Sequence, residues 1–221
     1  MFDVQDFLWK LSFLLIPGIF AITLHEVAHG WAAKRLGDTT AYMLGRLSVN
    51  PLKHIDPMGT VIVPLAMYFL GGMVFGWAKP VPVSFRNLRN PKRDMVLVAA
   101  AGPGANFAMA LGWALIAWFV NGFVGLNSVP SLWVLNNCQA GILLNVGLGV
   151  FNLLPIPPLD GGRVLSGLLP LSASRIFDRV EPFGFMILIL LLIAPGQPLF
   201  RLLEPFFNSL VRFYSSVAGF A

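Results

Sequence analysis

The sequence contains one cysteine, Cys138, and few charged residues. A single cysteine excludes an internal disulfide and a cluster of thiolate metal ligands. Charged residues make up 11% of the 221 residues, against about 25% in a soluble domain, whereas hydrophobic residues make up 57%. We therefore predict one integral membrane domain over residues 1–221, with a core at about 7–163 and C-terminal helices at about 175–217.

The net charge of +5 does not indicate nucleic-acid binding. The basic residues gather in short loops between apolar runs, as they do in loops that face the cytoplasm. Five of them lie between Lys79 and Arg93. The partner that this pattern predicts is the lipid bilayer, with no nucleic acid.

The apolar runs predict an all-α, multi-pass membrane protein with a core of three transmembrane helices. We expect these helices at residues 7–35, 95–120 and 132–154. One or two C-terminal helices follow, at residues 183–194 and 199–213. The second of these carries charges among large apolar side chains, so that it either spans the membrane or lies in its interface.

Two of the three histidines of the chain lie in the first apolar run, four residues apart. On a helix, His25 and His29 project from one face and can hold one metal ion, and Glu26 lies near the same edge. This is the H-E-x-x-H pattern of zinc-dependent hydrolases. The alternative is a chance pair of packed histidines, but three ionisable side chains in five positions at membrane depth favour a shared task.

A catalytic zinc ion usually takes three protein ligands and leaves a fourth position open. Asp160 is the leading candidate for the third ligand, because carboxylates are rare near membrane segments. It follows a proline-rich stretch at residues 155–158, which forces an extended chain just past a helix end, and it precedes Gly161 and Gly162. The alternative is an ordinary Asp-Gly surface turn.

If Asp160 joins the two histidines, the first and fourth apolar segments must end on the same side of the membrane. Residues 58–77 must then leave and return on that side. Their interruption by Pro64 and by the glycines at 71 and 72 fits such a re-entrant segment. The basic loop after it would face the cytoplasm, which places the site nearer the cytoplasmic side.

With these features, the sequence resembles the site-2 protease family of intramembrane zinc metalloproteases, in its short form without a PDZ or CBS domain. The resemblance rests on three stretches in this order: residues 25–29 (HEVAH), 102–106 (GPGAN) and 152–162 (NLLPIPPLDGG). Residues 50–57 (NPLKHIDP) look like the short bacterial subgroup.

The resemblance implies a zinc metalloendopeptidase of the bacterial inner membrane that cleaves peptide bonds in or near transmembrane segments. It implies that His25, His29 and Asp160 bind one zinc ion, that Glu26 is the catalytic acid/base, and that Asn152 lies near the oxyanion. A helical peptide bond is shielded, so the expected partner is a membrane protein whose transmembrane segment is locally unwound.

Two further residues and two segments keep two interpretations each. Asn106 is either a second oxyanion donor or a helix-packing amide. His54 is either a fourth zinc contact that substrate displaces or a solvated loop histidine. Residues 41–49 and 81–85 are either short strands whose edges hold an extended substrate, or loops without substrate contact.

Two other functions stay open. A metal-handling membrane protein would also place histidine and aspartate in a membrane, but it would typically carry several ligand sets along a path. A catalytically silent scaffold would keep the fold without needing Glu26. The sequence indicates no oligomeric state.

Overall fold

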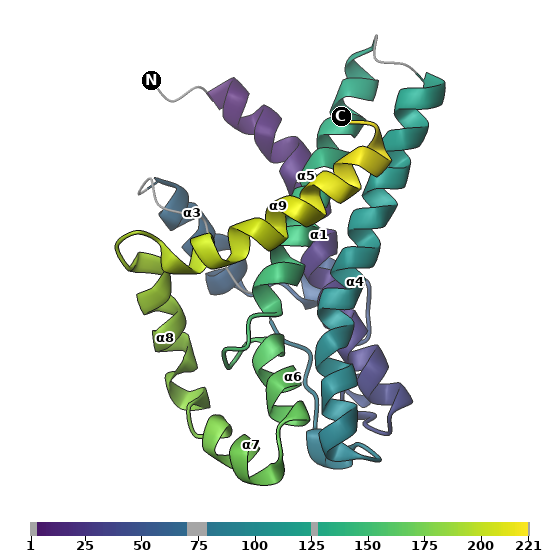
Figure 1. Cartoon of the computed structure of the whole chain (residues 1–221). Coiled ribbons are helices and arrows are strands. Elements are labelled where there is room, and N and C mark those ends of the chain that lie inside the picture. The colour runs from purple at the N-terminus through teal and green to yellow at the C-terminus, as the bar shows by residue number, and fades with distance from the viewer. Residues whose placement is uncertain (1–3, 70–78, 125–127, 221) are drawn as a thin grey trace.

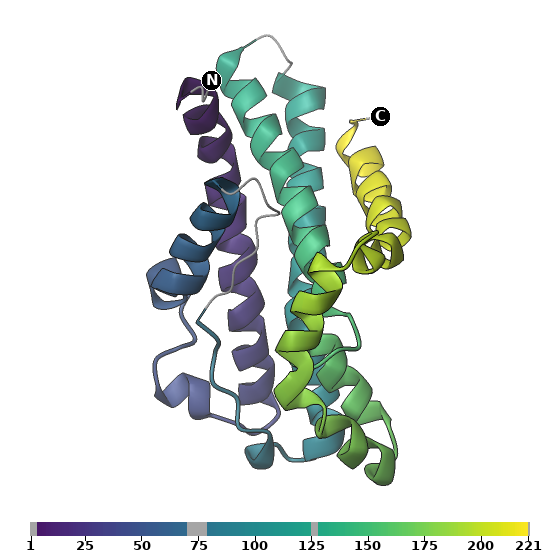
Figure 2. The same ribbon diagram turned by 90° about the vertical axis from the view of Figure 1, so that its left-hand side faces the viewer.

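The computed structural model describes residues 4–69, 79–124 and 128–220, and these residues form helices and turns with no strand. Three helices are long and apolar enough to cross a membrane: α1 (Val4–Arg35), α4 (Pro91–Phe119, continued by a wider turn, Val120–Val124) and α5 (Val129–Asn152). They lie side by side as a bundle (Figures 1 and 2). The predicted all-α, multi-pass membrane architecture is confirmed.

Local sequence determines where α1 ends and where α4 begins. α1 finishes in a basic turn, and Gly37 follows with a φ of 115°, a conformation that glycine adopts without strain. α4 begins at Pro91, and the Asp94 carboxylate accepts a hydrogen bond from the Asn90 N–H (2.9 Å). The end of α1 and the start of α4 therefore lie at the same end of the bundle (Figure 1).

Small residues allow α4 to pack closely against α5 and α9 (Pro198–Ala218). Ala110, Ala114 and Ala117 are fully buried on α4. Trp113 packs against Gly141 of α5 so closely that a methyl group at Gly141 would overlap the indole ring. Lipid tails are as apolar as the helix surfaces, so no hydrophobic force drives helices together in a membrane. Helix contacts there depend on close van der Waals packing, which small residues permit.

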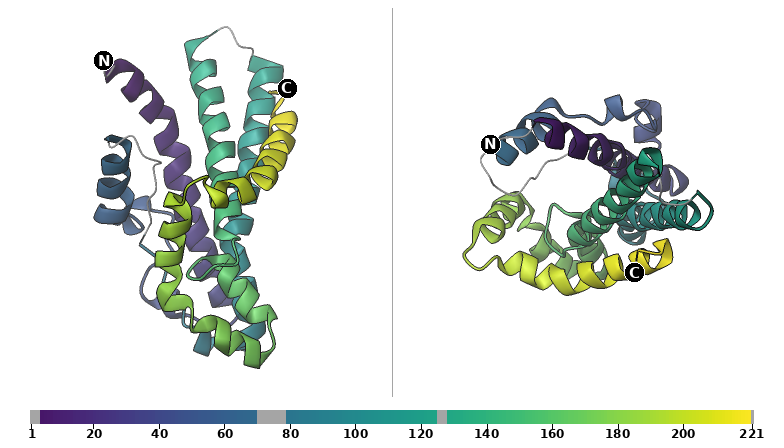
Figure 3. Two further views of the ribbon diagram at one scale, coloured as in Figure 1. Left: turned by 60° about the vertical axis from the view of Figure 1, so that its left-hand side comes forward. Right: turned by 90° about the horizontal axis from the view of Figure 1, so that it is seen from above.

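The shorter helices surround this bundle. They are α2 (Thr40–Met43), α3 (Val63–Phe69), α6 (Asp160–Leu168), α7 (Leu171–Asp178) and α8 (Glu181–Ile193), with single turns at Pro51–Lys53, Pro57–Ile62 and Phe85–Asn87. Figure 3 shows α8 and α9 on one side of the bundle and α3 on the side of α1. Three helices thus follow α6, where the sequence predicted one or two. α9 packs against α4 and α5, and it is not among the helices apolar enough to span.

The expected strand at residues 41–49 is wrong. The Asp38 carboxylate accepts a hydrogen bond from the Thr40 N–H (3.1 Å), and the chain turns at once into α2. Gly45 then adopts a φ of 64°, which lies outside the range of regular strands. The alternation of apolar and polar residues here reflects a turn that is fixed by a side chain.

The expected strand at residues 81–85 is also wrong. The Val81 N–H donates to Glu26 Oε2 and the Ser84 N–H donates to Asp38 Oδ2, each over 2.7 Å. A strand edge needs such donors for its neighbour. Here carboxylates of α1 and of the loop after it take them, so the segment is extended but unpaired.

The re-entrant segment at residues 58–77 is described only in part, because residues 70–78 lie outside the described residues. Its described part is helical, from Pro57 to Phe69. The Lys79 N–H donates to the His54 carbonyl oxygen (2.9 Å), so the chain returns beside the point from which it left. This is the closure that a re-entrant hairpin requires.

Candidate metal centre

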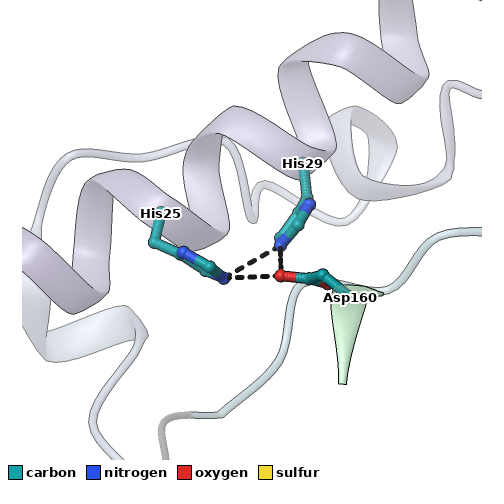
Figure 4. Close-up of side chains that lie close together, drawn as sticks. All are labelled: His25, His29 and Asp160. Atoms are coloured by element: carbon teal, nitrogen blue, oxygen red, sulfur yellow. Dashed lines mark hydrogen bonds and ion pairs between the residues drawn. The ribbon is translucent and has the colours of Figure 1, made fainter. Parts of the chain in front are cut away.

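Two imidazoles project from one face of α1, as the four-residue spacing predicts. His25 and His29 are both buried, and their Nε2 atoms lie 3.0 Å apart. Figure 4 shows both rings directed at Asp160. The H-E-x-x-H stretch therefore folds as a continuous helix, with both rings directed into the protein.

Asp160 is distant from the two histidines in the sequence and is the first residue of α6. Sequence reasoning expected it in an irregular segment; the irregular part is the turn before it, and α6 begins at Asp160 itself. Its Oδ2 lies 3.2 Å from each Nε2. A methyl group at Gly161 would overlap the backbone of Leu153, so this close turn depends on glycine.

Backbone and amide acceptors fix the proton positions on both rings. His29 Nδ1 lies 2.8 Å from the Val98 carbonyl oxygen, which can only accept, so this nitrogen carries the proton. His25 Nδ1 lies 2.6 Å from Asn106 Oδ1. In the neutral rings both Nε2 atoms therefore present lone pairs to Asp160, as metal-ligating histidines do.

The group has the chemistry of a zinc site. Among the described residues, His25, His29 and Asp160 form the one set whose ligand atoms gather within 4.8 Å of one another. Asp160 Oδ2 is buried without a hydrogen-bond partner. A shared metal cation would satisfy two lone pairs and an unpartnered carboxylate oxygen at this distance, and two nitrogens with one oxygen are a usual zinc set.

The metal centre opens on a cavity of about 450 Å³. Glu26 lines it beside the three ligands, and its Oε2 accepts the hydrogen bond from the Val81 N–H. Arg163 also lines the cavity, with its guanidinium over the Phe85 ring (5.3 Å). Ligands, a carboxylate and open space thus meet at one place.

The two candidate oxyanion donors lie at different places. Asn152 lines the cavity, and its Nδ2 donates to the Leu148 carbonyl of its own helix (3.0 Å). Asn106 is fully buried behind His25 and donates to Ala21 O (3.1 Å) and Asn145 Oδ1 (2.9 Å). The structure therefore brings Asn152 to the cavity and places Asn106 outside the cavity wall, against His25.

This structure does not bring His54 to the metal centre. His54 Nε2 lies 2.8 Å from the Ser48 carbonyl oxygen, and the residue is 1% exposed. It belongs neither to the ligand group nor to the cavity wall. It is not a solvated loop histidine either, because its side chain is buried.

Sequence reasoning missed the support that α4 gives the histidines. Val98, Gly102 and Asn106 follow one another at four-residue spacing on one face of α4. A methyl group at Gly102 would lie 2.7 Å from His25 Cε1 and closer still to His29. The signal was the spacing of Gly102 and Asn106, whereas nothing in the sequence marks the Val98 carbonyl.

The fold and the site define a membrane protein with a metal centre of the H-E-x-x-H type, and comparisons with known proteins give its family. The family description of Peptidase family M50 matches residues 13–195. YwhC of Bacillus subtilis (strain 168), whose name places it among zinc metalloproteases, is 34% identical over 94% of this chain and 93% of its own length. Rip2 of Mycolicibacterium smegmatis is 31% identical over 93% of this chain and 74% of its own length.

A more distant relative is the regulator of sigma-E protease RseP of Escherichia coli, which is 32% identical over 61% of this chain and 31% of its own length. No solved structure matches the chain. The chain belongs to peptidase family M50, the site-2 protease family, and is a zinc metalloprotease.

Proposed function

We propose that this zinc metalloprotease cleaves peptide bonds in or near transmembrane segments of membrane proteins. The observation that carries the proposal is the position of the ligands: His25 and His29 lie on α1, a helix long and apolar enough to span a membrane, and face its neighbours in the bundle. A scissile bond must therefore reach a site between spanning helices.

His25, His29 and Asp160 would hold the zinc ion. A bound zinc ion supplies Lewis-acid polarisation of the scissile carbonyl and lowers the pKa of a water molecule to near 7.

Glu26 is the general base and acid in this proposal. Its Oε2 is held by the Val81 N–H, so we assign the other carboxylate oxygen to accept the water proton and pass it to the leaving amine. Asn152 is the side chain in the cavity that can turn its amide toward the developing oxyanion.

The substrate reaches this cavity as an extended segment, because a helix hides its peptide bonds. Pro80, Val81, Val83 and Phe85 line the cavity. Carboxylates already accept from the Val81 and Ser84 N–H groups, so we propose that side-chain pockets rather than main-chain pairing hold the substrate.

We place the site nearer the cytoplasmic side of a bacterial inner membrane. The basic end of α1 and the basic start of α4 lie at the same end of the bundle as α6, whose first residue is the ligand Asp160 (Figure 1). Basic residues concentrate on the cytoplasmic side of membrane proteins.

The test compares cells that produce the wild-type protein with cells that produce Glu26→Gln. Membrane proteins that accumulate uncut in the variant are candidate substrates, and each is then incubated with purified wild-type or variant protein in lipid vesicles. We expect cleavage by the wild type alone, with the same zinc content in both. Equal cleavage by both would remove Glu26 from the mechanism; no cleaved membrane protein at all would contradict the proposed function.

A further inference from the structure

We propose that Asn145 and Asn106 are positioning residues that set the affinity of the metal centre, although neither reaches the metal. They form a hydrogen-bonded relay from α5 through α4 to His25 on α1. The proposal rests on the metal centre of the proposed function but not on its substrate.

The relay is fully buried. Asn106 and Asn145 each have 0% exposure, and the bond from Asn106 Nδ2 to Asn145 Oδ1 is 2.9 Å long. At the other end, Asn106 Oδ1 lies 2.6 Å from His25 Nδ1. Buried amides at such distances hold one another in place, because losing a partner leaves a polar group unsatisfied away from water.

Two backbone carbonyls fix the direction of every bond in the relay. Asn145 Nδ2 donates to Gly141 O (2.9 Å), and that oxygen can only accept, so Asn145 turns its own oxygen to Asn106. Asn106 must then present its amide nitrogen to Asn145 and to Ala21 O (3.1 Å). Its oxygen is left for His25, which must donate from Nδ1.

This direction determines the state of the ligand. A neutral imidazole has one N–H, so a proton fixed on Nδ1 leaves Nε2 unprotonated and aimed at Asp160. Without the relay the His25 ring can rotate, or it can carry its proton on Nε2, and both states compete with metal binding. An outer partner of a ligating histidine typically contributes 10- to 100-fold in metal affinity.

The chain offers a matched control for a buried asparagine. Asn137 lies on α5 like Asn145, is 3% exposed, and donates to the carbonyl four residues earlier, Trp133 O (3.0 Å). It has no contact with Asn106. Asn137→Ala and Asn145→Ala therefore remove the same groups from the same helix, and only the second breaks the relay.

The experiment measures the zinc dissociation constant of the purified full chain in detergent by competition with a chelator. The visible absorption of the Co²⁺-substituted protein reports ligand geometry. We expect Asn106→Ala to weaken zinc binding about 10- to 100-fold and to alter the Co²⁺ spectrum. Asn145→Ala should weaken zinc binding less but in the same direction, while Asn137→Ala should match the wild type.

Zinc affinity of Asn106→Ala and Asn145→Ala within twofold of Asn137→Ala would overturn the relay. If Asn106→Ala does not fold, the comparison of Asn145→Ala with Asn137→Ala decides alone. Zinc binding that is unchanged in the His25→Ala variant would contradict the metal centre itself. Zinc lost in His25→Ala but kept in the asparagine variants would contradict the relay only.

Discussion

Replacing Gly102 by alanine should weaken zinc binding. The added methyl carbon would lie 2.7 Å from His25 Cε1 and closer to His29 Nε2 and Cε1, whereas ordinary contacts begin at 3.4 Å. The methyl group meets the two ligand rings, so either the rings turn away or α4 moves back. Zinc–nitrogen bonds are about 2.0–2.1 Å long and do not tolerate such shifts.

Overpacking of this kind costs about 1–3 kcal/mol, and each 1.4 kcal/mol changes an equilibrium tenfold. We therefore expect Gly102→Ala to raise the zinc dissociation constant about 5- to 140-fold. The control is Gly104→Ala, two residues along the same helix, where an added methyl group meets no atom within 4 Å. Both changes give the same gain in helix propensity, so their difference isolates the contact with the histidines.

The assay is chelator competition on both purified variants, with circular dichroism to confirm equal helix content. Zinc affinity of Gly102→Ala within twofold of Gly104→Ala would refute the close approach of α4 to the ligand rings.

Three further predictions concern the surroundings of the site. Val81→Pro removes the N–H that holds Glu26, so we expect kcat to fall about 10²-fold with KM and zinc content unchanged. Val81→Ala keeps the N–H and should retain wild-type kcat. An equal loss of kcat in both variants would contradict the role of the Val81 N–H in holding Glu26. Burial raises the pKa of Asp38, but hydrogen bonds from Thr40, Ser84 and Asn87 outweigh burial and lower it. The wild type should therefore be more stable than Asp38→Asn, with the full difference above about pH 4 and a smaller difference as the pH falls further. A difference in melting temperature that does not change with pH would contradict this prediction. A cysteine in place of Arg89 should react with a membrane-impermeant thiol reagent only from the cytoplasmic side, and buried Cys138 should give a low background. Labelling from outside would contradict the proposed topology.

The sequence predicted the parts of this protein that depend on local pattern. The spacing of His25 and His29 needs only a helix, and the rarity of carboxylates in apolar surroundings pointed to Asp160. The three long apolar runs gave the core helices, because twenty or more apolar residues have few other solutions in a membrane.

The parts that sequence reasoning missed depend on contacts between distant segments. Residues 81–85 look like a strand edge until Glu26 and Asp38, far away in the chain, take their N–H groups. His54 looks like a solvated loop residue by sequence, yet its side chain is buried. Asn106 carries no sign of its partner Asn145, which lies 39 residues further on.

X-ray absorption at the zinc edge of the purified wild-type protein, with the zinc content per chain, tests the central claim most directly. We expect one zinc ion per chain with two imidazole nitrogens and one carboxylate oxygen at about 2.0–2.2 Å, and loss of this signal in Asp160→Ala. A wild-type protein without zinc, or zinc that Asp160→Ala retains with an unchanged spectrum, would contradict the account.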